Sequence, residues 1–324
     1  MARESISKRV YCKRAVYLDI KGKPLLQADL TEALLKLKKI GNRKEILGED
    51  GQYVRAIIYH RKYAGMLFGI LASYEIGTYH LTLADDDNAE MLTVEQVAPQ
   101  NNDANKRQEF IEGVCYFGIS NNHIVIAPSR SLGAKPMEEY TNWILEQTDL
   151  INENNRVCFS DLVAKVTRER IKSSHVKQVE IGTPLFDFSQ SQSLVERQSV
   201  ANIEYGGFGM KILRQMLSAD QLNSMHLVDA LDGNIEVTLK IRYKRTTTEK
   251  AHNVLDNIAL AVRNLDEDEV KLTLDGGGTV KGSELKLSTL LNIQARNGIP
   301  NPDDLFEKMR DWLIQQIENK IIEP

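Results

Sequence analysis

The sequence predicts an α+β protein, built mainly from antiparallel sheets with flanking helices and divided into two domains. Hydrophobic residues recur at every second position in many short segments, most clearly over residues 235–245, which is typical of half-buried strands. Other segments repeat apolar residues at helical spacing, and no internal repeat or alternating strand–helix series indicates a parallel sheet. With 324 residues and 42% hydrophobic content, the chain is long enough for two cores.

The first half of the chain forms the expected N-terminal, sheet-rich domain, residues 1–151. A strand is predicted at 10–20, followed after Pro24 by a helix with Asp29 as its cap. A helix opening at Pro136 and ending near Leu150 closes the domain. Between the helices, Gly, Asn and Asp clusters separate extended segments that favour antiparallel pairing: 52–60, 63–71, 78–83, 90–97, 110–119 and 122–127.

The expected C-terminal α+β domain covers residues 152–324. A helix is predicted at 159–171, beginning at Ser160, and a strand at 176–181. Residues 187–199 are rich in Ser and Gln and predict a flexible loop. Two short helices are expected after the glycines at 206–209, one with Ser218 and Gln221 at capping-box spacing.

The last 90 residues give the clearest pattern. After the strand at 235–244, a capping box at 246–249 opens a helix with Val254, Leu255 and Ile258 on its apolar face. Strands at 270–274 and 285–293 are joined by a turn at Gly276 to Gly278, and the loop fails the phosphate-loop pattern. Asn301 and Pro302 supply the cap and first residue of a final helix that buries Leu305, Met309, Trp312 and Leu313.

Composition excludes several protein classes. A formal charge of −4 and a pI near 6.0 argue against a protein that coats nucleic acid over its whole surface, so any polyanion site must be local. Cys12, Cys115 and Cys158 have neither metal-ligand nor redox spacing, and no histidine pair does. The N-terminus lacks a secretory apolar core, and the longest near-apolar run, 63–74, is too short to cross a bilayer. A cytoplasmic protein without cofactor or metal is expected.

Two basic segments provide the main functional lead. The strand at 235–245 turns one row of cations to the face opposite its apolar residues, and 165–177 carries further cations at helical spacing. Such rows suit the phosphates of DNA, although a merely solvated face explains them too. Few aromatics interleave, which favours phosphate contacts over base stacking. The candidate DNA-binding residues are Lys240, Arg242, Lys244, Arg245, Lys165, Arg168, Arg170, Lys172 and Lys177.

Two other classes of function stay open. Asp275 at the end of one predicted strand, with Glu284 and Lys286 on the next, has the composition of a metal-dependent nuclease site. Ordinary alternating surface charge gives the same spacing by chance. The acidic segment 85–112 suggests instead a protein-interaction module that docks a basic partner.

The order of elements from residue 112 onward resembles the RexA family, the DNA-binding component of the Rex phage-exclusion system of lambdoid prophages. The resemblance rests on the hairpin at 113–127 leading to the helix at Pro136, the stretch 162–182, the strand 235–245 ending in Lys244-Arg245, and the closing helix–strand–strand–helix order. It implies a homodimer that binds DNA without marked sequence preference in anti-phage defence, with a separate membrane or nuclease effector. Lys240, Arg242, Lys244 and Arg245 match the family's basic strand, whereas the acidic segment and the Ser/Gln loop depart from the family.

Overall fold

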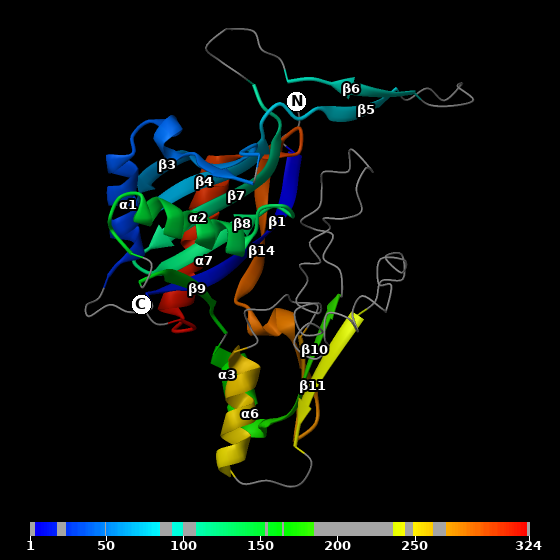
Figure 1. Cartoon of the computed structure of the whole chain (residues 1–324). Helices are drawn as coiled ribbons and strands as arrows, with labels where there is room; N and C mark the ends of the chain where they lie inside the picture. Colours follow the sequence, from blue (N-terminus) through cyan, green and yellow to red (C-terminus); the bar gives the residue numbers. More distant parts are fainter. Residues whose placement is uncertain are drawn as a thin grey trace. The chain divides into compact units, whose positions relative to one another are not determined.

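The chain folds into two compact units, which are described separately here (Figure 1). In the computed structural model, the described residues are 4–17, 24–48, 50–84, 93–99, 108–152, 155–163, 165–184, 236–243, 249–261 and 270–322. The first unit comprises residues 1–160 and 288–324, and the second comprises 161–287. The predicted loop at 187–199, the two short helices after residue 206 and the first three residues of the capping box at 246–249 lie outside the described residues.

The division differs from the expected boundary after residue 151, because the C-terminal segment returns to the first unit. Strand β14 (Ser288–Arg296) pairs antiparallel with β1 (Glu4–Tyr17), from Glu4 opposite Ala295 to Tyr11 opposite Ser288. The hydrogen-bonded ladder therefore joins residues nearly 300 positions apart in the sequence.

A nine-stranded sheet forms the centre of the first unit, with the strand order β15-β14-β1-β8-β7-β4-β3-β2 and with β9 also pairing with β1. The predicted alternating segments are confirmed as strands, and the helix predicted at 159–171 is wrong at its start, where β9 lies. Strands β5 and β6 pair with each other in a two-stranded ribbon that is not part of the nine-stranded sheet. The further strands are β2 (Glu45–Leu47), β3 (Tyr53–Tyr63), β4 (Met66–Glu75), β5 (His80–Ala84), β6 (Thr93–Val97), β7 (Ile111–Ser120), β8 (His123–Pro128), β9 (Val157–Asp161) and β15 (Ile299–Pro300).

Helices cover both faces of this sheet. Leu67 and Phe117 point to the face on which α1 (Leu26–Lys36) and α2 (Ala134–Glu146) pack. Phe68 points to the other face, where its ring stacks on Phe306 of α7 (Pro302–Glu318), with 5.0 Å between centroids. Asn301 caps α7 and Pro302 opens it, as predicted, but α1 begins three residues before Asp29, which therefore is not its cap.

Two cross-strand contacts in this core require glycine. Gly69 lies opposite Phe117, and a Cβ added to Gly69 would meet the Phe117 ring at 2.2 Å. Gly118 receives Phe68 in the same way. The two phenylalanines thus pack over the glycines of the neighbouring strand, one on each face.

Gly69→Ala is expected to lower the free energy of unfolding of the first unit by about 1–3 kcal/mol, because the buried ring must shift in a packed core. Urea unfolding followed by tryptophan fluorescence measures this unit, since Trp143 and Trp312 both belong to it. Gly41→Ala is the matched control, because a Cβ there meets nothing within 4 Å. Equal stability of the two variants would contradict the packing argument.

The second unit has a four-stranded antiparallel sheet in the order β11-β10-β12-β13. Its core contains Val179, Leu272, Ile171 of α3 and Leu255 of α6, so both helices pack on one face of the sheet. The elements are α3 (Lys165–Ser174), β10 (Val176–Pro184), β11 (Glu236–Arg242), α6 (Glu249–Ala261), β12 (Val270–Leu274), β13 (Thr279–Lys281) and the short 3-10 helix η5 (Gly282–Leu285).

The strand predicted at 270–274 and the glycine turn after it are confirmed by the β12–β13 hairpin, in which Gly277 and Gly278 have positive φ. The strand predicted at 285–293 is wrong at its start, which lies in η5. Val254 was expected on the apolar face of α6 but is 59% exposed. Among the described residues, no helix combines the length and apolarity needed to cross a membrane.

Candidate nucleic-acid interface

The outer face of the four-stranded sheet gathers basic side chains from three strands. Successive residues of a strand point to opposite faces, and Val179, Ile181 and Leu272 fill the core. The residues between them therefore face outward in two cross-strand rows. One row is Lys240, Glu180, Lys271 and Lys281, and the next is Arg242, Gln178, Thr273 and Thr279.

These rows form a polar surface of defined size. Neighbouring strands lie about 4.8 Å apart, so the row from Lys240 to Lys281 spans roughly 15 Å, and the second row lies about 7 Å along the strands. Lys240, Arg242, Lys271 and Lys281 are exposed. We call these eight outward residues the basic sheet face.

Ion pairing divides the four cations into one neutralised and three unpaired groups. Lys240 Nζ lies 2.8 Å from Glu180 Oε1. The hydrogen bond from Lys240 lowers the pKa of Glu180, and Lys271 adds to this effect. Within the described part of the chain, Arg242, Lys271 and Lys281 form no ion pair. Four cations and one carboxylate leave the basic sheet face with a net charge of +3.

The edge strand β11 departs from the predicted burial pattern. Ile241 packs partly against the core, but Leu239 is 39% exposed. The apolar face predicted for this strand is therefore only partly buried at Leu239, because β11 is the edge strand among the described strands of its sheet. Lys244 and Arg245, also predicted to bind DNA, lie outside the described residues.

The predicted helical cations do not join the basic sheet face. Because Ile171 packs α3 against the opposite, apolar face of the sheet, the exposed side chains of Arg168 and Lys172 belong to the other layer. Arg170 pairs with Glu284 at 3.3 Å and donates to the carbonyl oxygen of Thr279 at 3.2 Å. Lys165 is the first residue of α3, and its side chain is outside the description.

Lys177, the last member of the predicted basic segment, is exposed at an irregularity of β10, where the register with β12 shifts between Val176 and Gln178. It is the second residue of β10 and has no partner position on β12, so it belongs to neither of the two cross-strand rows. The basic residues of segment 165–177 thus belong to two elements, the helix α3 and the start of the strand β10.

The two carboxylates of the predicted nuclease site differ in their surroundings: Glu284 is bonded to protein groups, whereas Asp275 lies in an exposed turn. Glu284 lies in η5, where its Oε1 accepts from the backbone N–H of Lys281 at 3.0 Å and its Oε2 pairs with Arg170. Asp275 is exposed in the hairpin turn, and Lys286 follows η5. In the part of the chain that the structure describes, no group of three His, Cys, Asp or Glu side chains is placed to hold a metal ion.

The acidic segment 85–112 is only partly described. Residues 85–92 and 100–107 lie outside the description, and with them most of its carboxylates. Glu109 accepts a hydrogen bond from the backbone N–H of Gly77 at 2.8 Å. Burial, together with the neighbouring Glu75, raises the pKa of Glu112. The described part gives no docking surface.

A polar cluster in the second unit escaped the sequence analysis. Asp256 of α6 is buried and accepts from the backbone N–H of Val176 at 2.7 Å, while its other oxygen lies 2.8 Å from His175 Nδ1. The His175 ring stacks on His252 with 4.7 Å between centroids. About 80 residues separate the partners, so no local sequence signal could have found them. The cluster anchors β10, the strand at the centre of the basic sheet face.

No protein-family model matches the chain, and no curated protein matches it.

Proposed function

We propose that this protein binds DNA without marked sequence preference, through phosphate contacts made by the basic sheet face. The observation that carries the proposal is the set of three unpaired, exposed cations, Arg242, Lys271 and Lys281, on adjacent rows of one sheet. A net charge of −4 for the whole chain makes this face a local positive patch on an acidic protein.

The composition of the face favours backbone contacts over reading of bases. Its uncharged members are Gln178, Thr273 and Thr279. Hydroxyl groups such as those of the two threonines also bind phosphate oxygens, whereas Gln178 Nε2 donates to Glu180 Oε1 at 2.9 Å. The eight residues include no aromatic side chain for base stacking. Binding should therefore depend strongly on salt and weakly on sequence.

The resemblance to the RexA family extends this proposal to a biological role. On that basis the protein acts as the cytoplasmic, non-enzymatic DNA-binding component of an anti-phage exclusion system. It would act as a homodimer and signal to a separate membrane or nuclease effector. The basic strand β11 is the part of the resemblance that the proposed interface uses.

The proposal is tested by removing only the unpaired cations. For the triple variant Arg242→Gln, Lys271→Gln and Lys281→Gln, the slope of log K against log salt for duplex DNA should fall by about 0.9 per lost contact, hence by about 3 units. Affinity at about 0.1 M salt should drop by roughly two to three orders of magnitude, equally for unrelated sequences. Fluorescence anisotropy with labelled duplexes measures both quantities.

The double variant Lys240→Gln, Glu180→Gln is the matched control, because it removes one cation and its paired carboxylate and leaves the net charge of the face unchanged. It should bind DNA much like the wild type. Arg168→Gln with Lys172→Gln tests the helical layer and should also have a small effect. A folded triple variant with wild-type affinity and salt slope would refute the proposed interface.

A further inference from the structure

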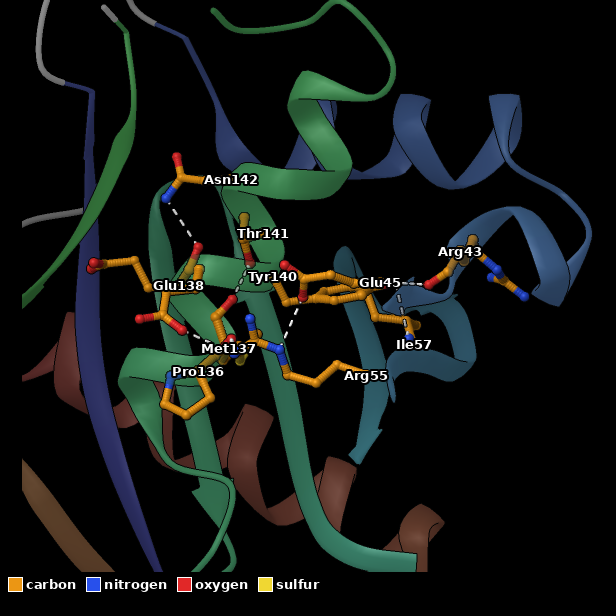
Figure 2. Close-up of polar contacts among 11 residues, drawn as sticks. Arg43, Glu45, Arg55, Ile57, Pro136, Met137, Glu138, Tyr140, Thr141 and Asn142 are labelled. Atoms are coloured by element: carbon orange, nitrogen blue, oxygen red, sulfur yellow. Dashed lines mark hydrogen bonds and ion pairs between the residues drawn. The ribbon is translucent and has the colours of Figure 1, made fainter. Parts of the chain in front are cut away.

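The first unit buries an arginine, Arg43, whose side chain has no hydrogen-bond or ion-pair partner among the described residues. Arg43, at the end of a 3-10 helix (η1, Ile40–Arg43), is 4% exposed. Its Nε and Nη1 atoms are enclosed, and within the described part of the chain they have no hydrogen-bond partner and the side chain forms no ion pair. Figure 2 shows its guanidinium pointing away from the neighbouring polar network.

Arg55 on β3 provides the comparison within the same unit. It is 5% exposed, but its Nε lies 2.9 Å from Glu45 Oε2, and its Nη1 lies 3.0 Å from Glu139 Oε2 and 3.1 Å from the carbonyl oxygen of Pro136 (Figure 2). Buried charges in proteins are ordinarily paired in this way, because leaving water costs more than a lone ion recovers. Arg43 departs from that rule.

The backbone of Arg43 is fixed in place, so its burial does not come from a loose loop. The Tyr140 hydroxyl donates to the carbonyl oxygen of Arg43 at 2.7 Å and accepts from the backbone N–H of Ile57 at 3.1 Å. Tyr140 itself is fully buried. Through Tyr140, the backbone of Arg43 at the end of η1 is therefore connected by hydrogen bonds to both α2 and β3.

The sequence next to Arg43 is basic as far as the buried Glu45. Residues 33–44 contain no Asp or Glu but carry Lys36, Lys38, Lys39, Arg43 and Lys44. Lys36 is engaged by Glu32 at 2.9 Å, and Lys44 Nζ lies over the Tyr74 ring, 5.6 Å from its centroid. Lys38 and Lys39 are exposed. His60 on β3 lies near enough that Arg43, after burial, contributes to lowering the pKa of its imidazole. A neutral His60 retains a ring N–H that can donate to an anion.

We propose that Arg43 is the receptor for a phosphate group, with Nη2 as the nitrogen open to it and with His60 and the exposed lysines as supporting donors. Nη2 is the guanidinium nitrogen that is neither enclosed nor bonded among the described residues. A planar guanidinium offers paired N–H donors to phosphate oxygens. The site lies in the first unit and is independent of the basic sheet face in the second.

Thermal unfolding of the full chain, followed by tryptophan fluorescence, tests the site with inorganic phosphate against sodium chloride at equal ionic strength. A ligand that binds the folded state raises the Tm with its concentration, so the wild-type Tm should rise in phosphate beyond the chloride control. Arg43→Met should lose this rise, and without phosphate its Tm should equal or exceed the wild-type value, because an unpaired buried charge is removed. Parallel titrations with a nucleoside diphosphate and a short DNA duplex show which phosphate source binds more tightly.

Arg55→Met is the matched control: it should lower the Tm and keep the phosphate-dependent rise. Arg43→Lys retains the positive charge but lacks the planar guanidinium, so its phosphate-dependent increase in Tm should be smaller than that of the wild type. This variant tests the site even if Arg43→Met fails to fold. The proposal is overturned if the wild-type Tm follows the chloride control. It is equally overturned if phosphate stabilises the Arg43 variants as much as the wild type.

Discussion

Replacing Arg55 by Met should lower the free energy of unfolding of the first unit by about 3–5 kcal/mol, because it leaves a buried carboxylate without its cation. Glu45 is 7% exposed, and its carboxylate meets Arg55 Nε at 2.9 Å. The same substitution frees Glu139 and the carbonyl oxygen of Pro136 from their hydrogen bonds to Arg55 Nη1. Urea unfolding followed by the fluorescence of Trp143 and Trp312 measures the loss.

The pH dependence of this variant has a defined sign. Burial already raises the pKa of Glu45, and the attraction of Arg55 partly offsets it. Without Arg55 the folded-state pKa of Glu45 rises further above its unfolded value. The folded state then binds more protons, so stability falls as the pH increases through the range between the two pKa values. The deficit of Arg55→Met should therefore be largest near neutral pH and shrink in mild acid.

The double variant Arg55→Met, Glu45→Gln removes both charges and should recover part of the loss at neutral pH. It should also lose the pH dependence that distinguishes the single variant. A stability loss in Arg55→Met no larger than that of Arg43→Met would contradict the distinction between a paired and an unpaired buried arginine.

The period-two pattern of hydrophobic residues was sufficient to predict a strand where buried and exposed residues alternate within that strand. In β12, Val270, Leu272 and Leu274 are buried while Lys271 is exposed, and the predicted bounds coincide with the observed ones. The cap and first residue of α7 were predictable for the same reason, since Asn301 and Pro302 act within one turn of helix.

Pairing between distant strands was not predictable from these patterns. Lys271 and Lys281 join the basic sheet face only because β10 pairs with β11 on one side and with β12 on the other. Register is a tertiary property that no single segment specifies. The return of β14 to β1 is non-local in the same sense, and it explains the misplaced domain boundary.

Short apolar segments were ambiguous even locally. Val157, Phe159 and Asp161 alternate as buried residues of β9, but Phe159 and Asp161 also fitted the start of a helix at 159–171. A run of this length does not distinguish the two periods. Arg43 illustrates another limit, because it lies in a run of lysines, and nothing in that run indicates that its side chain is buried.

The anchor of β10 leads to the second prediction with a large expected effect. Asp256 is 6% exposed, and its two oxygens accept from Val176 N at 2.7 Å and contact His175 Nδ1 at 2.8 Å. His175 adopts a left-handed conformation, with φ +48°, which is unfavourable for a residue with a Cβ and persists where surrounding contacts hold it. Asp256 supplies two of those contacts.

Asp256→Ala is expected to lower the stability of the second unit by about 2–4 kcal/mol, since it leaves a buried backbone N–H and an imidazole without their acceptor. Hydrogen exchange of the β10 amides measures this locally. At a tenfold change in equilibrium for each 1.4 kcal/mol, those amides should exchange roughly 30 to 700 times faster if they exchange through unfolding of this unit. Asp275→Ala is the control, because it removes an exposed carboxylate from the same sheet.

DNA binding by these variants also distinguishes residues that hold the sheet in place from residues that contact DNA directly. Because β10 occupies the centre of the sheet, loosening it should weaken DNA binding in Asp256→Ala by disturbing the spacing of the basic rows, although no cation is lost. The salt slope of the molecules that remain folded should then stay close to the wild-type value, in contrast to the triple cation variant. Slow β10 exchange in Asp256→Ala, indistinguishable from Asp275→Ala, would show that the strand is held by its apolar contacts alone.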